Sequence, residues 1–91
     1  MDLTRAGIGM LINQPGDLTS ELMLDIFFSV GQRGDIIILK NDGIRESKKF
    51  SVIITSGKEA FESIRKDGDD LSEILKEVLT KYSEMSQSSG T

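Results

Sequence analysis

The side chains that most often carry out chemistry in proteins are missing from this sequence. Its 91 residues include no Cys and no His. The chain therefore has no thiolate nucleophile, no disulfide, no thiolate zinc site and no imidazole base or metal ligand. A reaction would have to rest on carboxylates, Lys, Ser or Tyr, and no spacing in the chain groups these into a catalytic site. We expect a protein that is not an enzyme and that needs no cofactor.

The densest group of charges is the acidic cluster Asp67, Asp69, Asp70 and Glu73. Carboxylates in this number suit Mg²⁺ or Ca²⁺, but the spacing does not fit an EF-hand loop, because Glu73 follows Asp67 by six residues instead of eleven. Acids in the first turn of a helix cap its amide groups and complement its dipole. We therefore interpret the cluster as the start of a helix and predict no metal site.

Residues 5–12 alternate between apolar and other side chains, which predicts a strand with one apolar face. The pair Gly7 and Gly9 resembles half of a dinucleotide-binding motif, but the third glycine is missing and no helix is expected after the pair. We attribute the two glycines to an edge strand or a bulge. Residues 13–16, Asn-Gln-Pro-Gly, then predict a turn.

A helix is expected from about residue 18 to Gly31, because residues 17–20 offer several N-caps and glycine favours the position after a helix. Its apolar side chains cover more than half of its circumference, so it should lie between other elements or contact a partner. A second helix is predicted between Ser56 and Gly68, since Ser56 and Glu59 form a capping box.

The last helix should begin at Asp69 or Asp70 and continue to Tyr82, with an apolar stripe at helical spacing. Glu77 and Lys81 are placed to form an i,i+4 ion pair on it. Residues 83–91 are rich in Ser and are expected to form a disordered tail. We therefore expect one domain over residues 1–82.

The middle of the chain predicts a β-hairpin. Residues 36–39 form a β-branched run, and residues 41–43, Asn-Asp-Gly, are a strong turn signal. The return segment 44–55 is either one bent strand or two short strands. Together the elements predict an α+β domain, a two-layer sandwich in which about three helices pack on one face of a small antiparallel sheet.

One face of this hairpin is the best candidate for an interaction surface. If the alternate apolar residues face the helices, the opposite face carries Ile36, Ile38 and Ile53, which we call the isoleucine patch. Three exposed isoleucines approach the area of a functional surface patch. We predict that they bind a protein partner or form a weak homodimer, with Lys40, Arg45 and Lys49 at the rim. The competing explanations are that the tail or the N-terminal strand covers them, or that the strand is central in the sheet and only partly open.

Basic residues around the hairpin suggest a different function. Lys40, Arg45, Lys48 and Lys49 could contact phosphate, which makes a nucleic-acid-associated accessory module the alternative. The whole chain carries a net charge of −4, however, and aromatic side chains make up only 5% of it. Stacking platforms for nucleic-acid bases are therefore not expected, and lysines on edge strands also protect against sheet aggregation. We do not favour nucleic acid as the partner.

Residues 42–55 and 61–71 are similar to segments of small uncharacterised archaeal proteins, a resemblance that covers about the C-terminal two-thirds of the chain. It implies a two-layer α/β sandwich and a cytoplasmic archaeal protein, and it brings no catalytic motif to transfer. A cytoplasmic location also agrees with the chain itself, which has no run of about 20 apolar residues and so no expected membrane partner.

Overall fold

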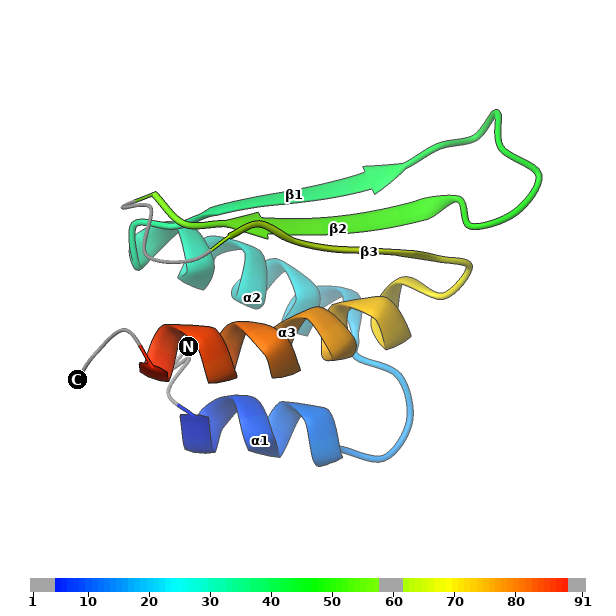
Figure 1. Cartoon of the computed structure of the whole chain (residues 1–91). Helices are drawn as coiled ribbons and strands as arrows, with labels where there is room; N and C mark the ends of the chain where they lie inside the picture. The colour runs from blue at the N-terminus through cyan, green and yellow to red at the C-terminus, as the bar shows by residue number, and fades with distance from the viewer. Residues whose placement is uncertain (1–4, 58–61, 89–91) are drawn as a thin grey trace.

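Three helices and a three-stranded antiparallel sheet form the part of the protein that the computed structural model describes, residues 5–57 and 62–88. The strands lie in the order β1-β2-β3, and the helices all lie on one side of the sheet (Figure 1). This arrangement confirms the predicted α+β class. In chain order the elements are α1 (Arg5–Asn13), α2 (Ser20–Gln32), β1 (Ile36–Asn41), β2 (Phe50–Thr55), β3 (Ile64–Gly68) and α3 (Leu71–Ser88).

The N-terminal segment is a helix, so the strand predicted over residues 5–12 is wrong. α1 buries Ile8 and Leu11, which are three residues apart and share one face of a helix, and it leaves Met10 78% exposed. The buried face packs against α3, on the side of α3 that is away from the sheet (Figure 1). Gly7 and Gly9 therefore lie within a helix and do not belong to an edge strand or a bulge.

α2 confirms the helix expected from about residue 18. The Thr19 side chain caps its first turn, and the left-handed residue after it is Gly34, with φ +89°, where the sequence suggested Gly31. The helix lies under β1 (Figure 1) and buries one face. Leu24 and Phe28, 54% and 61% exposed, point away from the core. The described residues therefore do not enclose this helix on all sides.

The hairpin has a shorter return strand and a longer loop than expected. β1 and β2 pair continuously over six residue pairs, with Ile38 opposite Ile53. The turn signal is confirmed locally, because Asp42 Oδ1 accepts a hydrogen bond from the Ile44 amide at 3.1 Å. Residues 42–49 are nevertheless all loop, closed by a 2.8 Å hydrogen bond from the Asp42 amide to the Lys49 carbonyl. Residues 44–49 do not extend the strand.

The helix predicted to end at Gly68 is wrong, because residues 64–68 form β3, which pairs with β2. Glu59, the second half of the expected capping box, lies outside the described residues. α3 begins as predicted, with Asp70 Oδ1 accepting a hydrogen bond from the Glu73 amide at 3.2 Å.

α3 continues to Ser88, six residues past the boundary expected at Tyr82. Ser83, the first residue of the expected tail, is buried at 8% exposure, and Met85 is partly buried against the core. Residues 83–88 are therefore part of the helix, while residues 89–91 lie outside the described chain.

The core lies between the sheet and the helices. Val52 and Ile54 of β2 face it from above and are fully buried. The predicted apolar stripe of α3 faces these two residues. The helical spacing of the stripe and the side of α3 that is buried were therefore both predicted correctly. Within the described residues, no helix is both long and apolar enough to cross a membrane. The fully buried side chains of the core on α2 and α3 are Ile26, Val30, Leu75, Val78, Leu79 and Tyr82.

Candidate functional site

The face of the sheet that is turned away from the helices carries the isoleucine patch. Ile36 and Ile38 are 51% and 47% exposed, and Ile53, opposite Ile38 on β2, is partly buried. The alternate residues Val52 and Ile54 are buried under the helices. The two faces of the hairpin were therefore assigned correctly from the sequence. No described segment covers the patch, because α1 and the C-terminal turns of α3 both lie on the other side of the sheet (Figure 1).

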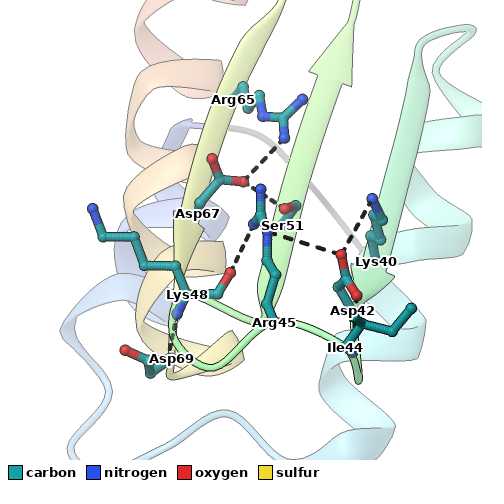
Figure 2. Close-up of polar contacts among 9 residues, drawn as sticks. All are labelled: Lys40, Asp42, Ile44, Arg45, Lys48, Ser51, Arg65, Asp67 and Asp69. Carbon is teal, nitrogen blue, oxygen red and sulfur yellow. Dashed lines mark hydrogen bonds and ion pairs between the residues drawn. The ribbon is translucent and has the colours of Figure 1, made fainter.

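A polar network occupies the other end of the same face. Ser51 is 1% exposed, and its hydroxyl donates a 2.5 Å hydrogen bond to Asp67 Oδ1 on the neighbouring strand (Figure 2). The Arg65 guanidinium is 3.4 Å from the same carboxylate oxygen. The Ser51 hydrogen bond, helped by Arg65, lowers the pKa of Asp67 from its ordinary value, because both favour the ionised carboxylate.

Arg45, predicted at the rim, holds the loop between β1 and β2. It donates a 2.9 Å hydrogen bond to the Lys48 carbonyl, and its Nε is 3.8 Å from Asp42 Oδ2 (Figure 2). Lys48 has a positive φ of 52°, and its amide donates a 2.6 Å hydrogen bond to Asp69 Oδ1. The loop is thus fixed at both the Arg45 side chain and the Lys48 backbone, and Lys49 is exposed beside it.

The predicted basic rim is only partly neutralised, because Lys40 and Arg45 share one carboxylate. Lys40 Nζ lies 3.9 Å from Asp42 Oδ2, the same oxygen that Arg45 approaches. Arg65 is paired with Asp67. Each of these three cations therefore has a carboxylate within reach, which weakens the attraction that the rim can offer to a phosphate backbone.

The acidic cluster is divided among several elements. Asp67 lies on β3 and faces Ser51, Asp69 lies in the loop after β3 and holds Lys48, and only Asp70 caps α3. The expectation that all four acids belong to a helix start is therefore correct only for Asp70 and for Glu73, which lies in the first turn. Within the described chain, no three carboxylates converge as a metal site would require.

One cluster around the buried Tyr82 had no clear signal in the sequence. The Tyr82 hydroxyl donates a 2.5 Å hydrogen bond to Asp35 Oδ2, and the Arg33 guanidinium lies 5.2 Å from the centre of the Tyr82 ring. Burial and the contact with Asp35 raise the pKa of Tyr82, so the phenol stays protonated. Asp35 also accepts a 3.4 Å hydrogen bond from the Gly57 amide. The cluster joins the start of β1, the end of β2 and α3, which is a structural role.

A groove of about 330 Å³ between β3 and α3 was also not foreseen. Ile64 and Val78 lie among its apolar lining, and Lys66 Nζ pairs with Glu77 Oε2 at 3.3 Å. This ion pair replaces the Glu77 to Lys81 pair expected from the helical spacing. The walls carry charges of both signs, and they contain no arrangement of nucleophile and base.

No protein-family model, curated protein or solved structure matches this chain. The resemblance to small archaeal proteins therefore stays a prediction. The function has to be inferred from the isoleucine patch and the groups around it.

Proposed function

We propose that this protein is a non-enzymatic interaction domain that binds another protein chain through the isoleucine patch. The partner that we propose first is a second copy of the same chain. The observation that carries the proposal is the exposure of Ile36 and Ile38 beside Ile53, on a sheet face that no described element covers. Contiguous apolar surface of this kind commonly marks an interaction site in soluble proteins.

The energetics favour a weak complex. Burying three isoleucine side chains contributes at most about 5–8 kcal/mol, and the loss of translational and rotational freedom removes much of it. The rim adds specificity, because it presents Lys40, Arg45 and Lys49 beside the carboxylates of Asp42 and Asp67. Both signs of charge are therefore available to a second copy of the same surface. We expect a micromolar dissociation constant.

Two other partners remain as alternatives. A different protein would use the same patch and the same rim. A nucleic acid would have to compete with Asp42 for Lys40 and Arg45 and with Asp67 for Arg65, so these ion pairs give this alternative less support.

Sedimentation equilibrium of the full chain, from about 1 µM to about 1 mM, tests the proposal, because this range brackets a micromolar constant. The wild type should show a mass that rises with concentration. Ile38→Lys should remain monomeric, with an unchanged far-UV circular dichroism spectrum, since the side chain is exposed and its loss leaves no cavity.

The matched control is Ile44→Lys. Ile44 is 94% exposed on the loop and lies off the patch, so this variant introduces the same charge and should associate like the wild type. A wild type that stays monomeric throughout the range would refute self-association. Equal effects of the two substitutions would show that nonspecific association, and not the isoleucine patch, drives self-association.

A further inference from the structure

The sheet has two free edges within the described residues, and the two edge strands differ in how many charged side chains they carry. β2 lies between β1 and β3, so each outer strand has one side without a strand partner there. Such an edge presents unpaired amide and carbonyl groups that another strand can bind, and soluble proteins usually protect it with charges, prolines or bulges.

The β3 edge is protected. Arg65 and Asp67 place charges on the outer face, and Lys66 points to the helical side, where Glu77 of α3 pairs with it. A charged side chain that points inward from an edge strand disfavours the addition of another strand, because pairing would bury it further.

The β1 edge has none of these protections over residues 36–39. All four side chains are apolar, the only proline of the chain is Pro15, and the unbroken register with β2 excludes a bulge. Asp35 directly precedes this apolar run and Lys40 directly follows it, so the charges lie at its two ends and not within it. A hydrophobic edge left in this state would recruit strands from other molecules without control, so we infer that it has a specific occupant.

We propose that the β1 edge pairs antiparallel with β1 of a second copy, about a two-fold axis beside Ile38, to form one continuous six-stranded sheet. The inference rests on the self-association of the proposed function and names its geometry. Opposite residues of an antiparallel pair must lie on the same face, which leaves only alternate registers. With Ile38 opposite itself, Ile37 meets Leu39 and Ile36 meets the aliphatic stem of Lys40, so no like charges oppose each other.

This pairing explains why the patch lies at the margin of the sheet. The axis would join the two isoleucine patches into one apolar surface across the joined sheet. It would also place both α2 helices, which carry exposed Leu24 and Phe28, on the same side of that sheet (Figure 1). The paired edges are only about 20 Å long, so the contact is smaller than the roughly 1,600 Å² of a standard interface and should give micromolar affinity.

The experiment is sedimentation equilibrium of the full chain with a pair of opposite charges at position 38. Ile38→Lys and Ile38→Glu should each weaken the dimer by more than about tenfold, because each places two like charges face to face. An equimolar mixture of the two variants should form a 1:1 dimer again, since the ammonium and the carboxylate then oppose each other across the axis.

Two further variants keep the geometry testable. Ile36→Glu should tighten the dimer a few-fold, because the new carboxylate faces Lys40 of the second copy, and Ile36→Lys should weaken it. The matched control is Thr55→Lys, which adds the same charge on the same face of the central strand but outside the isoleucine patch, and it should leave the dimer intact.

The outcomes separate this inference from the proposed function. A wild type that is monomeric at every concentration refutes both. A wild-type dimer that Thr55→Lys abolishes as fully as Ile38→Lys refutes edge pairing and favours packing of the two sheets face to face. A mixture of the two position-38 variants that stays monomeric refutes the axis at Ile38. Restoration by the mixture, with Thr55→Lys still dimeric, supports the pairing.

Discussion

The hydrogen bond from Ser51 to Asp67 makes the stability of the folded protein depend on pH. Its buried hydroxyl lowers the pKa of Asp67, so the folded state favours the ionised carboxylate. An aspartate that is unfolded titrates near pH 3.9. The stabilisation from Asp67 is therefore present above about pH 4 and is lost as the pH falls through the lowered pKa of the folded state.

Ser51→Ala should raise the pKa of Asp67 towards its ordinary value, measured by NMR titration of the carboxyl carbon. The variant should be less stable than the wild type at pH 7, and it should lose less stability on acidification, because less of its stability depends on the ionised form. Ser47→Ala, on the exposed loop, is the matched control and should change neither quantity. An unchanged Asp67 pKa in Ser51→Ala would assign the shift to Arg65.

Gly57, whose amide donates a hydrogen bond to Asp35, lies where a side chain would meet the backbone of Gly34. A Cβ atom added there would lie 2.0 Å from the Gly34 carbonyl oxygen, and Gly34 cannot move easily because it occupies the left-handed conformation between α2 and β1. Gly57→Ala should therefore lower the free energy of unfolding by about 1–3 kcal/mol, as overpacking does, measured by urea denaturation.

Gly31→Ala gives the opposite expectation and serves as its control. Gly31 lies near the end of α2 with open space around the position of a Cβ atom, and its φ is negative. Alanine there should stabilise the protein by up to about 0.5–1 kcal/mol, since it reduces the conformational freedom of the unfolded chain. If both alanine variants proved neutral, the tight contact between Gly57 and Gly34 would not exist in solution.

The residues of the candidate site were partly predictable. A period of two in a β-branched run is enough to place Ile36 and Ile38 on one face, whatever the other elements do. The bond from Ser51 to Asp67 depends on the register between β2 and β3, and that register could not be deduced while residues 64–68 were assigned to a helix. The contact of Tyr82 with Asp35 spans 47 residues and has no local signal.

At the scale of elements, the errors occur where two periodicities fit the same residues. In α1 the alternation of Ala6, Ile8, Met10 and Ile12 matches a strand, but Ile8 and Leu11 also match a helix, and the contact with α3 selects the helix. β3 has a single buried apolar residue, Ile64, and its strand conformation comes from pairing with β2. Local propensity was overridden by tertiary structure in both cases.

The C-terminal turns of α3 give an element-scale prediction. A chain that ends at Tyr82 should melt at a temperature lower by about 4 °C or more, since that corresponds to roughly 1 kcal/mol in a protein of this size. The reason is that Ser83 is buried and Met85 packs against the core. A chain that ends at Ser88 keeps all of α3 and is the control. Equal melting temperatures for the two truncated chains would mean that the last turns of the helix contribute nothing.

At the scale of the whole molecule, the arrangement of charge matters more than its total. The protein has a net charge of −4, and three of the cations on and beside its basic hairpin, Lys40, Arg45 and Arg65, pair with Asp42 or Asp67. Non-specific nucleic-acid binders reach dissociation constants of about 10⁻⁴–10⁻⁶ M at physiological salt by neutralising phosphates with free cations. We expect no saturable binding of single-stranded or duplex DNA up to about 100 µM protein under those conditions, measured by fluorescence anisotropy.

Removing the carboxylates of Asp42 and Asp67 should leave Lys40, Arg45 and Arg65 without their ion-pair partners. The double variant Asp42→Asn with Asp67→Asn keeps the oxygens that accept from Ile44 and Ser51, so the loop and the sheet should stay folded. It should bind DNA measurably at about 50 mM salt, and the affinity should fall steeply as salt rises, because binding releases counterions. Glu21→Gln with Asp25→Asn changes the net charge equally on exposed positions of α2, on the helical side of the sheet, and should show no such binding. If the wild type already bound DNA with this salt dependence, the carboxylates would not neutralise the hairpin, and the nucleic-acid alternative would replace the interaction domain proposed above.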